Sequence, residues 1–191
     1  MERKDYLLMK LDYLKYRVLC IINRRYKMKY WVEYCKNRGM EVGDNTHIFS
    51  FIGQGEPYLI KIGNNTTISS DVTFLTHDAS IGALTDRMEK SDLVGKIVVG
   101  DHVFIGNGSI ILCGCTIGDR SIVAAGSVVV NSIPPDVVVG GNPARIICST
   151  NDYIKNNTSL FLGLHGLSYM EKKMIILNEG KFKKRRLLDF L

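Results

Sequence analysis

A six-residue period constrains this sequence more than any other feature. From residue 99 onward an aliphatic residue returns at every sixth position, and a small or β-branched residue follows four positions after each of them. This period matches neither an amphipathic helix, nor a coiled-coil heptad, nor an alternating strand. The aliphatic positions are Val99, Ile105, Ile111, Ile117, Val123 and Val129, and the second set is Val103, Ser109, Cys115, Ser121, Ser127 and Ile133.

A short strand followed by a tight turn explains the period physically. If each turn bends the chain by a third of a circle, three repeats close one triangular coil, and successive coils stack into a solenoid. The aliphatic residues then point inward, while Gly, Asn and Asp occupy the bends. Upstream, Ile62 and Ile68 start further repeats and Val42 starts a fainter one. The sequence therefore predicts a mainly β fold, a parallel β-helix. A β-sandwich with regular turns is the alternative, which six consecutive repeats in phase disfavour.

Breaks in the period divide the chain. Residues 41–148 form the predicted β-helix, and residues 79–92, which lack the repeat, are interpreted as a loop excursion from it. Pro134 and Pro135 are expected to end or displace the sheet, because proline cannot donate a ladder hydrogen bond. Residues 1–40 and 149–191 carry apolar residues at helical spacing and are predicted to be helical, basic terminal segments.

Charge and cysteine content limit the partners and the compartment. The formal net charge is +6, but the basic residues gather in residues 1–40 and 171–191, while the middle of the chain is acidic. A nucleic-acid-binding domain would carry that charge on its own fold, so no nucleic acid is expected. The basic ends also carry apolar helix faces, and such segments can bind an anionic membrane surface. Peripheral membrane contact is therefore one hypothesis. Five cysteines without paired spacing, and no signal-peptide pattern, favour the cytoplasm or the inner face of its membrane.

Several motifs within residues 60–148 resemble those of the hexapeptide-repeat O-acetyltransferases. This group contains the galactoside, maltose and xenobiotic acetyltransferases, and the polysaccharide-modifying members are the most similar. The resemblance implies a left-handed β-helix, a homotrimer, and acetyl-CoA as acyl donor in the groove between neighbouring subunits. The motifs are Ile105-Gly106-Asn107-Gly108-Ser109, Ile117-Gly118-Asp119, the run 123–129, Ile133-Pro134-Pro135 and the closing run 140–145.

Carried over by position, the resemblance also implies which residues contact the cofactor. Val130 and Asn131 stand where relatives commonly have a Thr-Lys pair, and Cys148 replaces a basic residue, so Arg145 is expected to carry more of the phosphate binding. The implied cofactor contacts are Asn107, Ala125, Val130, Asn131 and Arg145.

The chemistry requires a base. Acyl transfer from a thioester to a hydroxyl needs that hydroxyl's proton removed, and an imidazole suits this role at neutral pH. Of four histidines, His77 stands immediately before the excursion, where the family's catalytic histidine is found. We therefore predict His77 as general base in direct transfer within a ternary complex, with Asp78 and His102 near the acceptor, and the Asn107 amide or a backbone N–H as oxyanion donor. The expected acceptor is a hydroxyl of a sugar or polysaccharide precursor.

Two other classes remain open. A γ-type carbonic anhydrase shares the solenoid, but its zinc needs three converging imidazoles, and only His77 and His102 are available, so no metal is expected. A non-catalytic trimeric scaffold would use the basic, apolar ends to dock partners and would not bind coenzyme A.

Overall fold

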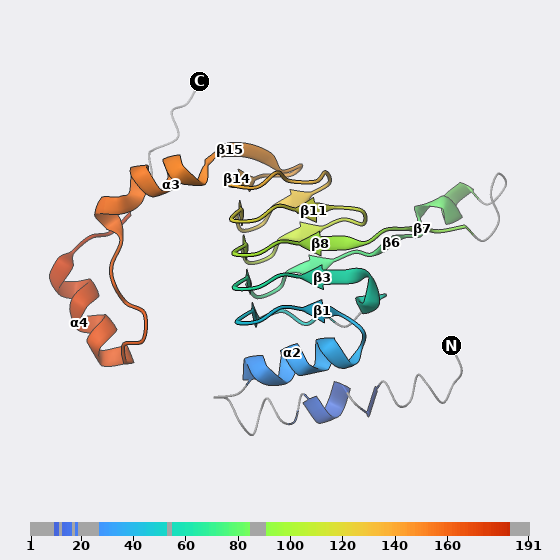
Figure 1. Cartoon of the computed structure of the whole chain (residues 1–191), viewed down its shortest axis with the longest axis horizontal. Helices are drawn as coiled ribbons and strands as arrows, with labels where there is room; N and C mark the ends of the chain where they lie inside the picture. The colour runs from blue at the N-terminus through green and yellow to red at the C-terminus, as the bar shows by residue number, and fades with distance from the viewer. Residues whose placement is uncertain are drawn as a thin grey trace. The chain divides into compact units, whose positions relative to one another are not determined.

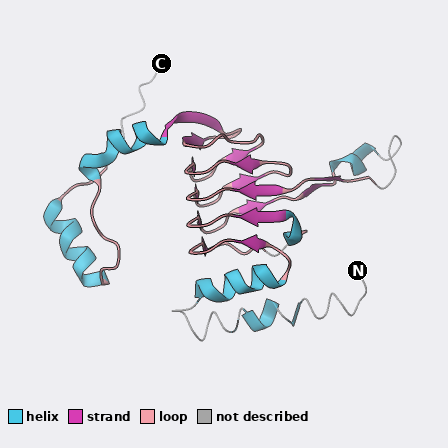
Figure 2. Cartoon of the chain, in the orientation of Figure 1, coloured by secondary structure: helices cyan, strands magenta, loops and turns pink. Residues whose placement is uncertain are grey.

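The computed structural model describes residues 10, 11, 13–16, 18, 27–52, 55–84 and 91–183. About half of the predicted N-terminal helical segment (residues 1–9, 12, 17 and 19–26), and the basic run at 184–186, lie outside these residues. The described chain forms two compact units, residues 1–150 and 151–191. Figures 1 and 2 show the elements of the two units.

The first unit is a parallel β-helix with three sheets in its described part (Figure 1). Very short strands from successive coils stack in parallel within these sheets, and the last strand of the second sheet is antiparallel to its neighbour. The first sheet holds β1 (Glu41–Val42), β3 (Ile60–Ile62), β8 (Ile97–Val99) and β11 (Thr116–Ile117). The second holds β2 (His47–Ile48), β4 (Thr67–Ile68), β9 (Phe104–Ile105), β12 (Ile122–Val123), β14 (Val137–Gly140) and β15 (Arg145–Ser149), and the third holds β5 (Thr73–Phe74), β10 (Ile110–Ile111) and β13 (Val128–Val129).

The repeat residues form the core as predicted. All six aliphatic positions from Val99 to Val129 are 0–1% exposed, and the small residues between them are buried as well. Ile62 and Ile68, the upstream members, are equally buried. The buried Ser109 and Ser121 hydroxyls donate to backbone carbonyls, so these polar groups do not remain unsatisfied inside the coil.

The coil continues through the proline pair, which was expected either to end or to displace the sheet, and the sheet does not end there. Ile133 bridges to Ile117 in parallel, and β14 then pairs with β12 in register. The prolines fall at a corner, where no ladder hydrogen bond is required of them. The β-helix instead closes with β15, which turns back and pairs antiparallel with β14.

The excursion leaves the coil as an antiparallel arm. Strands β6 (His77–Asp78) and β7 (Leu93–Val94) pair with each other and extend away from the stack (Figure 2). A 3-10 helix, η3 (Ser80–Leu84), follows β6. Because the arm begins at His77, the corner where it leaves the coil carries the candidate site.

Helices account for the remaining described elements. Helix α2 (Lys27–Asn37) contacts β1 and β2 at the end of the stack, where its Tyr34 and Cys35 are buried. η2 (Pro57–Leu59) precedes β3. The second unit contains α3 (Thr150–Asn157), η4 (Thr158–Leu160) and α4 (Tyr169–Glu179). None of the described helices is long and apolar enough to cross a bilayer.

Candidate active site

A carboxylate and an imidazole meet at the corner between the third sheet and the excursion. His77 follows β5 by three residues, and Glu56 belongs to the segment just before η2, twenty-one residues earlier. Glu56 Oε2 lies 2.9 Å from His77 Nδ1 and accepts a 2.6 Å hydrogen bond from Thr76 Oγ1. Stacking of one coil on the next brings these distant positions together.

The two groups shift each other's proton affinity. The hydrogen bond from the Thr76 hydroxyl, followed by that from His77, lowers the pKa of Glu56. The hydrogen bond to Glu56, reinforced by its negative charge, raises the pKa of His77. Glu56 is therefore a carboxylate at neutral pH and can only accept, so the neutral imidazole holds its proton on Nδ1. The lone pair of Nε2 is then available as a base.

His77 is accessible to a substrate. Its side chain is 45% exposed, whereas that of Glu56 is 27% exposed. A hollow beside the imidazole is lined by Gly55, by His77 itself and by residues 73–76. The corner thus holds the half-exposed imidazole by Nδ1, and Nε2 has no hydrogen-bond partner among the described residues.

Gly55 fits this corner by lacking a side chain. Its φ of +78° lies in the left-handed region, which glycine adopts without a Cβ penalty. A Cβ there would stand 3.0 Å from Thr76 Oγ1 and 3.8 Å from His77 Nδ1. A larger residue would therefore press on the two groups that hold Glu56.

Asp78 and His102, the two expected acceptor contacts, occupy different places. Asp78 Oδ1 accepts from the Ser80 backbone N–H at 2.8 Å and so shapes the start of η3. His102 has a φ of +57° and lies at the corner between the first and second sheets, with Nε2 3.5 Å from Asn65 Nδ2. Within one chain, therefore, His102 does not share the corner of His77, and Glu56 rather than Asp78 contacts the imidazole.

The expected cofactor contacts fall into separate groups. Asn107 and Ala125 stack at the corner between the second and third sheets, where Gly126 N–H donates to the Asn107 carbonyl. The Asn107 amide donates to Ser70 O at 2.9 Å and to Asp71 Oδ2 at 3.4 Å, so this side chain, an expected oxyanion donor, already bonds the turn below it.

Val130, Asn131 and Arg145 are exposed. Val130 and Asn131 follow β13 at the corner of His77, two coils further along the stack, because Phe74, Ile111 and Val129 are in register. Arg145 begins β15, directly after the Asn142–Pro143–Ala144 turn, and its guanidinium donates to the Ala144 carbonyl.

Metal ligation finds no support in the described residues. Among them, no group of three or more His, Cys, Asp or Glu side chains converges as a metal site would require. His77 and His102, the two histidines available for a carbonic-anhydrase-like site, lie at different corners.

Comparison with known proteins identifies the family. Residues 96–131 match the model of the bacterial transferase hexapeptide, which comprises six repeats. The chain is 41% identical to Protein CapG of Staphylococcus aureus over 151 residues, which span 78% of this chain and 87% of the relative. This chain belongs to the hexapeptide-repeat acetyltransferase family. It is also 33% identical to the galactoside O-acetyltransferase of Escherichia coli K12, over 66% of this chain and 64% of that enzyme.

Solved structures agree with this family assignment. A hexapeptide-repeat acetyltransferase of Vibrio cholerae, complexed with acetyl coenzyme A, superposes with a TM-score of 0.57 at 26% identity, covering 77% of this chain and 90% of that one. A galactoside acetyltransferase in complex with coenzyme A gives a TM-score of 0.54 at 25% identity, covering 77% and 84% of the two chains. The family member described here is accordingly an acyltransferase.

Sequence reasoning missed Glu56. It stands between Gly55 and Pro57, outside any repeat with a clear phase, and no local motif connects it with His77. The available signal was indirect: a carboxylate about one coil length before a histidine becomes its neighbour when the coils stack.

Proposed function

We propose that this hexapeptide-repeat enzyme is an acetyl-CoA-dependent O-acetyltransferase that acts on a hydroxyl of a sugar or polysaccharide precursor. The observation that carries the proposal is the Glu56–His77 pair, because Glu56 fixes the proton on Nδ1 and leaves the lone pair of Nε2 free to act as a base, in a side chain that lines a hollow. The relative named as a galactoside O-acetyltransferase and the acetyl coenzyme A complex of the Vibrio cholerae enzyme support the choice of acceptor and donor.

The proposed reaction is a direct transfer within a ternary complex. His77 Nε2 takes the proton of the acceptor hydroxyl as its oxygen attacks the thioester carbonyl carbon, giving a tetrahedral intermediate. Collapse breaks the carbon–sulfur bond, and the imidazolium returns its proton to the departing thiolate. Glu56 supports the positive charge on the imidazolium during this cycle, as a carboxylate beside Nδ1 does in other acyl-transfer sites.

The thioester oxygen requires a hydrogen-bond donor as negative charge develops on it. Because the Asn107 side chain is engaged with Ser70 and Asp71, we favour a backbone N–H for this role. Asp78 and His102 remain proposed acceptor contacts, which for His102 implies that a second subunit places it near the site.

We further propose a left-handed winding and a homotrimer with the acetyl-CoA groove between subunits. The exposed Val130 and Asn131, at the corner of His77, would line that groove along the stack. Asn107 and Ala125 would contact it from another corner, and the exposed Arg145 would bind a phosphate of the coenzyme.

A coupled acceptor screen tests the function. Purified protein is incubated with acetyl-CoA and a panel of sugars, sugar nucleotides, serine and aminoglycosides, and free coenzyme A thiol is followed by its reaction with a chromogenic disulfide. The proposal predicts acceptor-dependent thiol release with a sugar hydroxyl and an ester in the product by mass spectrometry. Acetyl-CoA that neither binds, as measured by calorimetry, nor turns over with any acceptor would leave the scaffold alternative as the better account.

A further inference from the structure

Helix α4 of the second unit presents large apolar side chains to the solvent. Tyr169 is 78% exposed, Met170 and Met174 are each 61% exposed, and Leu177 is 64% exposed. Met170, Met174 and Leu177 are spaced by four and three residues and lie on one side of the helix, next to Tyr169. Within the described unit nothing covers this side, whereas Ile175 and Ile176 are half-buried.

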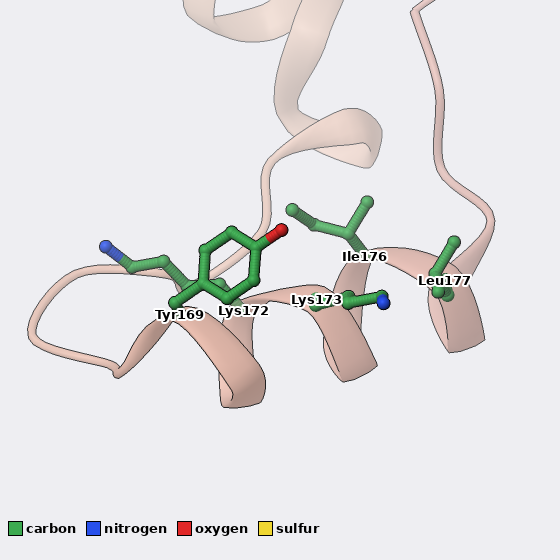
Figure 3. A pocket seen from close by; sticks show the side chains of 5 residues that line it. All are labelled: Tyr169, Lys172, Lys173, Ile176 and Leu177. Atoms are coloured by element: carbon green, nitrogen blue, oxygen red, sulfur yellow. The ribbon is translucent and has the colours of Figure 1, made fainter.

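Two lysines lie beside Tyr169 and Leu177. Figure 3 shows a pocket lined by Tyr169, Lys172, Lys173, Ile176 and Leu177, all from α4. No carboxylate of the described residues lies within ion-pair distance of Lys172 or Lys173. Lysine stems can cover apolar surface while their ammonium groups reach a polar layer above it. The pocket therefore combines a shallow apolar floor with unpaired positive charge.

The acidic groups of the helix are already engaged. Glu171 accepts from the Ser168 backbone N–H at 2.7 Å and completes a capping box, which lowers its pKa. Glu179 pairs with Lys181 at 2.8 Å. The two carboxylates are thus committed at the ends of α4, and the charge left beside the apolar side is that of Lys172 and Lys173.

We propose that α4 binds an anionic phospholipid surface, with Met170, Met174 and Leu177 entering the headgroup–acyl boundary and Lys172 and Lys173 contacting lipid phosphates. Such a helix lies in the plane of the interface, and its affinity rises with buried apolar area and with the anionic lipid content. A protein groove would provide walls for the apolar residues but would need its own acidic groups for both lysines. A vesicle surface supplies apolar depth and negative charge together.

Co-sedimentation of the full-length protein with vesicles tests this proposal. Vesicles of phosphatidylcholine alone are compared with vesicles that also contain phosphatidylglycerol. We expect wild type to bind the anionic vesicles, and Lys172→Gln with Lys173→Gln to reduce the bound fraction about fivefold or more. Met170→Gln with Met174→Gln should reduce it similarly, because glutamine keeps the length and helix propensity of methionine but not its apolar character.

A charge-matched control separates this helix from general basicity. Lys61→Gln with Lys96→Gln removes the same charge from exposed positions on the β-helix and should leave vesicle binding unchanged. Circular dichroism confirms that each variant is folded. The proposal is overturned if wild type does not prefer anionic vesicles, or if the α4 variants bind as wild type does. Reduced binding by the control to the same extent would also overturn it.

Discussion

The ring nitrogen of His77 that carries the proton determines which nitrogen can act as a base. A carboxylate at Nδ1 fixes the tautomer, so the lone pair of the neutral imidazole lies on Nε2, the atom that we propose as the base. Thr76 donates to the same Glu56 oxygen, which keeps that carboxylate charged and in place. The imidazole is thus held by neighbours rather than by burial, since it is itself largely exposed.

Replacing Glu56 with glutamine should change the pH profile. His77 acts as a base only when neutral, so the rate rises with pH through its pKa, which Glu56 raises. Without the negative charge that pKa falls, and the acid limb of kcat/KM moves to lower pH. We also expect kcat at neutral pH to fall about tenfold or more, because the imidazolium loses its counter-charge. Acceptor-dependent thiol release across the pH range measures both effects.

The exposed His165→Ala is the control for that experiment, and its profile should match wild type. A Glu56→Gln enzyme whose acid limb does not move would show that the carboxylate does not act through His77.

Single residues were predictable from the sequence only where local spacing fixed their surroundings. His77 was predicted because it stands immediately before the excursion, at the position where the resemblance to the family implies a catalytic histidine. Glu56 was not found, because its contact with His77 depends on the stacking of coils across an irregular segment. His102 was expected near the acceptor, yet its place in a Gly-Asp-His turn corresponds to that of Asn65, whose φ is also positive. A residue at such a corner adopts the positive φ that the turn requires, and its position is explained by the turn alone.

The corners of successive coils of the β-helix pack closely against one another. Glycine recurs there because the next coil passes over it: a Cβ on Gly106 would stand 2.5 Å from Ala125 N. On Gly118 a Cβ would overlap the backbone of Pro134 and Pro135. The proline pair thus forms the corner of the following coil, and the tight packing explains why the coil continues through it.

Gly118→Ala should destabilise the first unit by about 1–3 kcal/mol, because the added Cβ has no room and the proline corner is stiff. Urea unfolding followed by circular dichroism measures the change. Gly82→Ala is the matched control, since a Cβ at that position has nothing within 4 Å. Equal stability of the two variants would mean that the corners do not pack as described.

Sequence periodicity predicted the elements well where an inward residue recurs. The buried positions from Val99 to Val129 follow directly from the six-residue period, because each must point into the coil. β15 was not anticipated, since Ile146 and Ile147 are exposed and carry no repeat. Helix α3 lies within residues 149–191, which were predicted to be helical, but its eight residues contain few apolar side chains to mark its bounds.

The sides of the β-helix are suited to packing against other copies of the chain. A β-helix presents flat sides, and three copies packed about an axis form a closed assembly. Exposed apolar residues on the first unit, among them Phe104, Val130 and Ile147, are available for such packing. A groove between subunits would then bring residues of different corners to one site, which a single chain does not do.

Sedimentation equilibrium tests this assembly. We expect a species of three times the 21.5 kDa chain mass that persists on dilution to the concentration of the activity assay. An active monomer at that concentration would contradict a site shared between subunits.

If His77 is the base for acetyl transfer, its removal should slow the reaction strongly, and the steady-state rate of His77→Ala measures this. With acetyl-CoA and the acceptor found by the screen, we expect a kcat about 10²–10⁴-fold below wild type, because a general base is lost. Acetyl-CoA affinity, measured by calorimetry on the same protein, should stay close to that of wild type. A His77→Ala enzyme that retains a rate within about threefold of wild type would show that His77 is not the base, since a general base contributes far more than that.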